Sequence, residues 1–186
     1  MNREDLEHII RACSDITDQY EFIIVGSQSI LGPIPNPPEM FTMSAEADIY
    51  PLNAPELADQ IDAAIGEGSQ FHETYGYYAQ GVGPETATLP AGWLQRVYRV
   101  QSAATNDRVG YCLAVVDLFM SKAAADRDKD REFNMGLLKH GFVSATEALA
   151  LVPSMPLDDA EKRRLGARIR RWVKTLRDAG HEMPNP

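Results

Sequence analysis

The sequence predicts an α/β (α+β) fold, in which a small mixed sheet packs against helices and is followed by a helical C-terminal part. An apolar run from Phe22 to Val25 is typical of a buried strand, and a helical pattern precedes it. From Val116 onward the pattern is helical throughout. The length of 186 residues suits one domain with an appendage. We therefore expect a domain at residues 1–152 and a C-terminal basic helix packed on it at residues 153–186.

The N-terminal part alternates between helical and strand patterns. Residues 4–19 place apolar side chains on one side of a helix, and residues 45–52 are expected to form the second strand. Residues 54–65 predict a helix that ends at Gly66. The further predicted strands span residues 71–80, 93–100 and 109–116.

The C-terminal part predicts three helices. The first spans residues 117–139, and the second is short and spans residues 144–151. The last begins at Asp158 or Asp159, either of which can cap it, and runs to about Ala179.

A Gly-Ser pair follows the first strand. Gly26 allows the backbone to turn sharply and to approach a ligand closely. Ser27 is expected to cap a helix there, and the free N–H groups of a helix start attract phosphate. Residues 32–42 contain four prolines and predict a surface loop, which is either a lid over the site or a passive stiff loop.

Two carboxylates stand two residues apart on the second strand, Glu46 and Asp48. Residues i and i+2 of a strand point to the same face. Adjacent carboxylates repel unless a cation lies between them, and oxygen ligands of this kind suit Mg²⁺. The alternative is a surface strand whose outward residues are acidic, and a register that uses Asp48 and Tyr50 would leave one carboxylate.

The order strand, Gly26-Ser27 and Glu46-x-Asp48 resembles the nucleotidyltransferase superfamily typified by DNA polymerase beta. The later Asp117-Leu118-x-x-x-Lys122 and the run at residues 127–130 look like the helical part of uncharacterised and abortive-infection-type bacterial nucleotidyltransferase-like proteins. Together these matches cover about the first three-quarters of the chain.

This resemblance implies a polymerase-beta-like fold and transfer of a nucleotidyl group from an NTP to a hydroxyl of an RNA, protein or small-molecule acceptor. It implies that Glu46 and Asp48 are catalytic and bind Mg²⁺, and that Gly26, Ser27 and Lys122 bind the nucleotide. A toxin–antitoxin or phage-defence setting follows by analogy. The family usually has aspartate where Glu46 stands and often adds a third acid. The alternative is therefore a catalytically inactive, antitoxin-like module that binds a protein partner.

Charge is distributed unevenly along the chain. The net charge is −9, which disfavours broad binding to nucleic acid. Residues 162–177 nevertheless hold eight of the 18 basic residues, on the polar faces of an amphipathic helix. The commonest outcome for such a run is a solvated helix. Docking on the acidic body of this protein or of a partner, which includes a homo-oligomer, comes second, and binding of a nucleic-acid backbone comes third.

The remaining composition indicates a cytoplasmic protein that no membrane anchors. Cys13 and Cys112 have no metal-ligand spacing and lie in apolar surroundings, which favours buried free thiols. No stretch approaches the ~20 apolar residues that span a bilayer.

Overall fold

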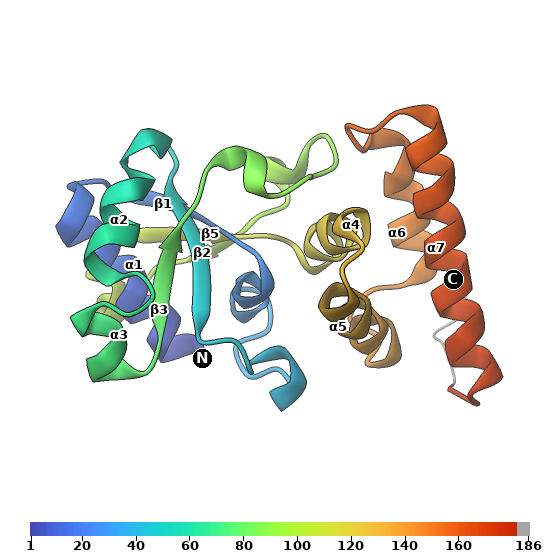
Figure 1. Ribbon diagram of the computed structural model, residues 1–186, viewed down its shortest axis with the longest axis horizontal. Helices are drawn as coiled ribbons and strands as arrows, with labels where there is room; N and C mark the ends of the chain where they lie inside the picture. Colours follow the sequence, from blue (N-terminus) through green and yellow to red (C-terminus); the bar gives the residue numbers. More distant parts are fainter. Residues whose placement is uncertain (182–186) are drawn as a thin grey trace. The chain divides into compact units, whose positions relative to one another are not determined.

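The computed structural model describes residues 1–181 and divides into two compact units (Figure 1). Unit 1 comprises Met1–Ala87 and Arg96–Ala114, and unit 2 comprises Thr88–Gln95 and the chain from Val115 onward. The boundary expected at residues 152–153 falls inside unit 2. As a division into domains it stays a prediction, and residues 182–186 of its C-terminal segment lie outside the described residues.

Unit 1 is built on a five-stranded mixed sheet with the strand order β3-β2-β1-β5-β4. The central strand β1 runs antiparallel to β2 and parallel to β5, while β2 and β3 are parallel and β4 and β5 are antiparallel. The mixed α/β class expected from the sequence is therefore confirmed. The strands are β1 (Glu21–Val25), β2 (Glu46–Pro51), β3 (Tyr78–Gly81), β4 (Tyr98–Val100) and β5 (Val109–Cys112).

Helices cover one face of this sheet (Figure 1). Two strand glycines show how closely they approach, because a side chain at Gly110 would meet Ile10 of the first helix and one at Gly81 would meet the backbone at Ala58 of the second. Small residues at such points let a helix lie close against a strand. The helices of unit 1 are α1 (Arg3–Thr17), α2 (Ala58–Ile65) and α3 (Gln70–Tyr75).

The expected strand at residues 71–80 is wrong in its first half. Ser69 caps α3 by accepting a hydrogen bond from the N–H of His72, and Gly76 ends the helix at a φ of 77°. Only the stretch from Tyr78 pairs with the sheet. A capping serine and a left-handed glycine therefore outweigh the strand preference of the aromatic residues. The strand expected at residues 93–100 likewise shrinks to the three residues of β4.

Unit 2 is helical, as expected, but the predicted helix at residues 117–139 is two helices. Asp126 adopts a left-handed φ of 55° and Arg127 is extended, so the chain turns between them. Trp172 packs edge-to-face on Phe119 at 6.1 Å between ring centroids in the core of the unit. The helices are α4 (Val115–Ala125), α5 (Asp128–Lys139), α6 (Ala145–Leu151) and α7 (Asp159–Asp178).

The proline-rich loop is anchored rather than free. Phe41 is 1% exposed, and Gln28 donates a hydrogen bond to its carbonyl oxygen. The Met1 ammonium donates to the carbonyl of Thr42 at 2.7 Å, and Arg3 donates to the carbonyl of Leu31. These contacts favour the stiff-loop alternative over a lid.

Both cysteines are buried free thiols, as expected. Burial raises the pKa of Cys112 to about 12 and that of Cys13 still further, so neither is a reactive thiolate at neutral pH. Of the helices within residues 1–181, none combines the length and the apolar character needed to cross a membrane.

Candidate functional site

The turn after β1 brings the backbone of Gly26 against the carboxylate of Asp48. Val25 and Asp48 are partners in the antiparallel ladder of β1 and β2, which fixes this proximity. Gly26 has a φ of 65° and a ψ of −167°, a combination that side chains disfavour, and a Cβ there would overlap Asp48 Oδ2. Only glycine fits this position, as the sequence suggested.

Ser27 begins a short 3₁₀ helix, η1 (Ser27–Leu31), rather than an α-helix. Its expected role as a helix cap is wrong, because the cap position is Gly26, which has no side chain to supply the bond. The turn is held instead by Ser29, whose hydroxyl donates to the carbonyl oxygen of Gly26 at 2.9 Å. Ser27 is half-buried beside this turn.

The two carboxylates of β2 share one face of the sheet, as expected. Ala47 and Ile49 are fully buried, whereas Glu46 and Asp48 are half-buried. Ile49 is registered with Gly81, the glycine that faces α2, so Ile49 points to the helical layer. Glu46 and Asp48 therefore lie on the opposite face of the sheet.

Tyr50, the other member of the alternative register, is only 4% exposed. Burial, with the nearby charge of Glu85, raises the pKa of Tyr50 to about 12. Its phenol is therefore neutral at physiological pH, and the carboxylates accessible on this strand are those of Glu46 and Asp48.

The neighbouring strand β3 adds a residue that the sequence did not single out for this role. Tyr78 is registered with Glu46, and its hydroxyl donates to Glu46 Oε2 at 3.3 Å. Burial, followed by the charge of Glu46, raises the pKa of Tyr78 to about 12. The His72 ring packs on the Tyr78 ring at 4.6 Å, and Gln80 is registered with Asp48.

The tyrosines at positions 75, 77 and 78 suit packing within a strand, so the sequence alone assigns Tyr78 no separate role. The information that places Tyr78 beside Glu46 is the parallel pairing of this stretch with β2. That pairing is a long-range property, and a strand predicted to begin at residue 71 instead of Tyr78 does not define the register with β2.

Lys122 belongs to unit 2, on α4, and is 7% exposed. Its ammonium donates to Asp130 Oδ1 at 2.9 Å and lies 4.5 Å from the centroid of the Phe133 ring. Arg127 Nε donates to the other oxygen of Asp130 at 2.6 Å. Burial lowers the pKa of Lys122, and the hydrogen bond to Asp130 opposes that shift. These contacts explain the lysine structurally, and its binding of phosphate stays a prediction.

The donor set of β2 fits Mg²⁺. Two half-buried carboxylates on one face, beside an open backbone turn, are the ligands that this ion takes while it keeps several waters for substrate oxygens. Within residues 1–181, no group of three or more His, Cys, Asp or Glu side chains is arranged to hold a metal. Glu46 and Asp48 are thus the protein ligands on which a bound ion would depend.

Comparison with known proteins gives one family. The model of the family described as "Nucleotidyltransferase of unknown function (DUF6036)" matches residues 4–140, which include Gly26, Ser27, Glu46, Asp48 and Lys122. Neither the curated proteins nor the solved structures gave a match. The mixed sheet with its covering helices is consistent with a nucleotidyltransferase-like fold. Because the match covers well over half of its length, the chain belongs to this nucleotidyltransferase family of unknown function.

Proposed function

We propose that this chain is a Mg²⁺-dependent nucleotidyltransferase that moves a nucleotidyl group from an NTP to a hydroxyl of an RNA, protein or small-molecule acceptor. The observation that carries the proposal is the close fit of Gly26 against Asp48. It sets a side-chain-free turn beside a carboxylate that shares its face with Glu46. Membership of the family supports it. The toxin–antitoxin or phage-defence setting and the cytoplasmic location stay predictions.

The chemistry needs little covalent help from the protein. The acceptor oxygen forms a bond to the α-phosphorus, and the bond from that phosphorus to its bridging oxygen breaks. Pyrophosphate leaves with the electron pair, and the hydroxyl proton is released to solvent. Mg²⁺, when bound, supplies neutralisation of the negative charge that develops on the phosphates.

In this proposal Glu46 and Asp48 hold the ion, and the backbone at Gly26 and Ser27 receives phosphate oxygens. Tyr78 orients Glu46 through its hydrogen bond. A hydrogen bond that fixes a ligating carboxylate tunes metal affinity, so Tyr78 is a positioning residue.

An inactive binding module is the second candidate. Two observations favour it. Glu46 stands where the superfamily usually has aspartate. Within residues 1–181, no third His, Cys, Asp or Glu side chain joins Glu46 and Asp48 in a group that could hold a metal. Mg²⁺ demands near-ideal octahedral geometry, so a longer carboxylate and a missing ligand both weaken binding.

Calorimetric titration of ATP, GTP, CTP and UTP, with and without Mg²⁺, separates the two candidates. The variant Glu46→Gln/Asp48→Asn keeps the shape of both side chains and removes both charges. Asp15→Asn/Glu132→Gln removes two charges from exposed positions and is the matched control. We expect metal-dependent binding that the first variant loses and the control keeps. Absence of binding for every nucleotide, in a protein shown to be folded, would refute the enzymatic function and favour the binding module.

A further inference from the structure

The two units differ strongly in charge. Unit 1 contains 16 acidic and five basic residues, whereas the rest of the chain contains 11 acidic and 13 basic residues. Residues 12–95 contain no lysine or arginine at all. A protein with a net charge of −9 therefore carries a strongly acidic unit and a unit whose basic residues are concentrated on one helix.

The basic residues of α7 form a continuous row. Arg163, Arg170 and Arg177 are seven residues apart, so they lie on one side of the helix at intervals of about 10.5 Å. Lys174 lies on the same side, and all four side chains are exposed. We call these four residues the basic face. Lys174 pairs with Asp178, but the three arginines make no ion pair within residues 1–181.

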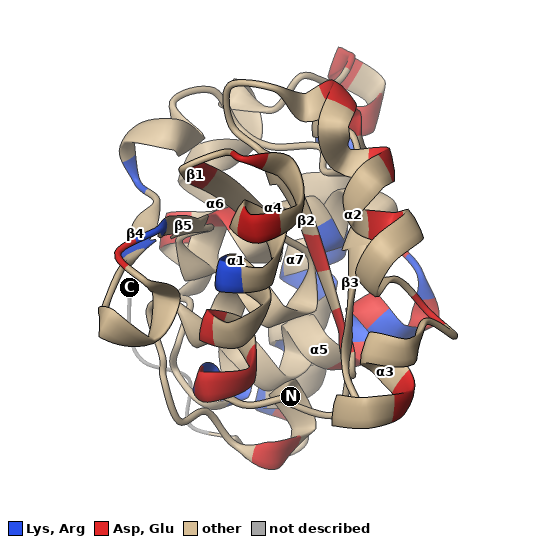
Figure 2. Ribbon diagram, turned by 90° about the vertical axis from the view of Figure 1, so that its left-hand side faces the viewer, with Lys and Arg blue, Asp and Glu red and all other residues tan. Residues whose placement is uncertain are grey.

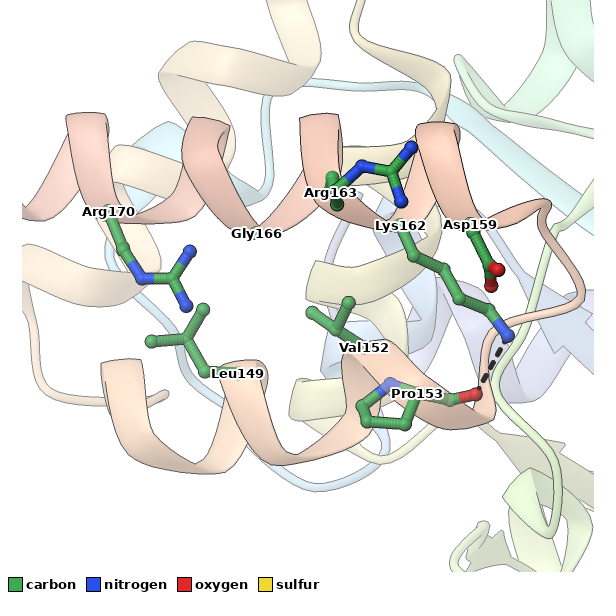
Figure 3. Close-up of a pocket in the computed structure, with 8 residues that line it drawn as sticks. All are labelled: Leu149, Val152, Pro153, Asp159, Lys162, Arg163, Gly166 and Arg170. Carbon is green, nitrogen blue, oxygen red and sulfur yellow. Dashed lines mark hydrogen bonds between the residues drawn. The ribbon is translucent and has the colours of Figure 1, made fainter.

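A cleft of about 640 Å³ runs along this face between α6 and α7 (Figure 3). Leu149, Val152 and Pro153 give it an aliphatic wall. Arg170 lies beside Leu149 at one end, and Lys162 donates to the carbonyl oxygen of Pro153 at the other. An apolar wall framed by cations suits an acidic surface that also presents an apolar side chain.

Unit 1 carries a matching surface. Its members lie on the 3₁₀ turn before α2, on α2 itself, on the segment that leads into α3, and on α3. All are exposed, and none makes an ion pair within residues 1–181. We call them the acidic face, and Figure 2 shows acidic residues along these helices. The acidic face consists of Glu56, Asp59, Asp62, Glu67 and Glu73.

The spacing and the apolar content of the two faces agree. Glu56, Asp59 and Asp62 recur every three residues, so the first and third are separated by roughly 9–10 Å, close to the interval between the arginines of α7. Tyr75, at the end of α3, is 51% exposed and packs at 4.7 Å on the ring of His8. An exposed, preordered tyrosine is a typical interface residue.

We propose that the basic face of α7, with its cleft, docks on the acidic face of α2 and α3 in a second copy of this chain. Each copy supplies both faces at equal concentration. The long-range repulsion between two acidic molecules is screened beyond about 8 Å at physiological salt, so complementary contacts decide the association. Nucleic acid fits less well, because the eight residues that line the cleft include no aromatic side chain on which a base would stack.

Sedimentation velocity tests this association over a range of about 1–200 µM protein, where weak dimers form. We expect a species of at least twice the 20.6 kDa of one chain. Its Kd should rise at least about tenfold between roughly 50 and 500 mM NaCl, because salt screens exposed charges. A protein that stays monomeric over the whole range would overturn the proposal.

Charge reversal identifies the faces. Arg163→Glu/Arg170→Glu reverses the basic face, and Asp59→Lys/Asp62→Lys reverses the acidic face. Each variant alone should raise Kd at least about 100-fold, since like charges then oppose each other. Arg131→Glu/Lys139→Glu makes the same charge change at exposed positions of α5 and should leave Kd unchanged.

A mixture of the two reversed variants gives the decisive result. In the mixture the acidic α7 of one variant meets the basic α2 of the other, and the native α7 meets the native α2, so association should return. Misfolding cannot produce this rescue. Failure of the rescue with two folded variants would overturn the proposal. So would binding of a fluorescent single-stranded RNA that needs Arg163 and Arg170 while the protein stays monomeric, since that result favours a nucleic-acid surface.

Discussion

Replacement of Lys122 by methionine should destabilise unit 2 strongly, although the new side chain keeps the apolar stem. The ammonium donates to Asp130, which is completely buried, so its removal leaves a carboxylate with one cation fewer. Breaking a buried pair on one side costs about 3–5 kcal/mol when no other partner remains. Arg127 still reaches Asp130 at 2.6 Å, which reduces the cost.

The contact of Lys122 with the Phe133 ring adds about 0.5–1 kcal/mol to the loss. Relief of the desolvation of the ammonium acts in the opposite direction. Together these terms give an expected decrease of about 2–4 kcal/mol in the free energy of unfolding. Urea unfolding at neutral pH measures it through the midpoint at constant m-value.

Lys139→Met is the matched control, because Lys139 is exposed on α5 and its replacement should change stability by no more than about 0.5 kcal/mol. Lys122→Met/Asp130→Leu should recover much of the loss, since no charge then stays buried without its partner. A decrease below about 1 kcal/mol in the single variant would refute the structural role. If such a stable variant also lost NTP binding, the predicted phosphate role of Lys122 would gain support.

Three further variants test the candidate site and the ion pairs of Asp130 with Lys122 and Arg127. Gly26→Ala should lower the free energy of unfolding in urea by about 3 kcal/mol, and the control Gly68→Ala by about 1 kcal/mol. Both glycines have a positive φ, but only Gly26 lies against Asp48. Equal decreases would contradict this contact. Because the pKa of Tyr78 is raised in the folded state, the neutral phenol contributes stability that is complete below pH ~10 and is lost as the pH rises toward about 12. Tyr78→Phe should therefore flatten the decrease in stability at alkaline pH. An unchanged decrease would count against the raised pKa. Burial would raise the pKa of Asp130, but its bonds from Arg127 and Lys122 outweigh that effect and lower it. The resulting stabilisation is complete above pH ~4 and is lost as pH falls through the folded pKa, so Asp130→Asn should flatten the acid limb of stability, and an unchanged limb would argue against a lowered pKa.

Much of the fold could be predicted from local sequence patterns. The apolar run of β1, the cap of α7 at Asp158, and the alternation of Glu46 and Asp48 depend on residues close in the chain, and the structure agrees with them. The sharp turn at Gly26 was also accessible, because a glycine at the end of a strand allows one, whereas its contact with Asp48 depends on the pairing of β1 with β2.

Long-range pairing could not be predicted in the same way. The segment at residues 70–81 has β-favouring aromatic residues in both halves, yet a capping serine and Gly76 turn its first half into a helix. The partnership of Tyr78 with Glu46 depends on the parallel register of β2 and β3. The break at Asp126 in unit 2 depends on a left-handed residue that allows Lys122 and Arg127 to reach one carboxylate. The register of β2 and β3 arises from tertiary contacts that a local pattern does not contain, whereas Ser69 and Gly76 are local signals that compete with the aromatic residues.

The uneven charge gives a physical reason for the metal in the proposed reaction. Gly26, Ser27, Glu46 and Asp48 all lie within residues 12–95, which contain 12 carboxylates and no lysine or arginine. A free NTP brought to this turn would meet the carboxylates of Glu46 and Asp48, which carry charge of its own sign. A divalent cation bound by Glu46 and Asp48 turns the same pair from a barrier into an attraction. The acidic pair therefore disfavours metal-free nucleotide and favours the metal complex, and binding without Mg²⁺ should improve when both charges are removed. If the two carboxylates had no function, their removal would neither abolish Mg²⁺-dependent binding nor improve binding without Mg²⁺.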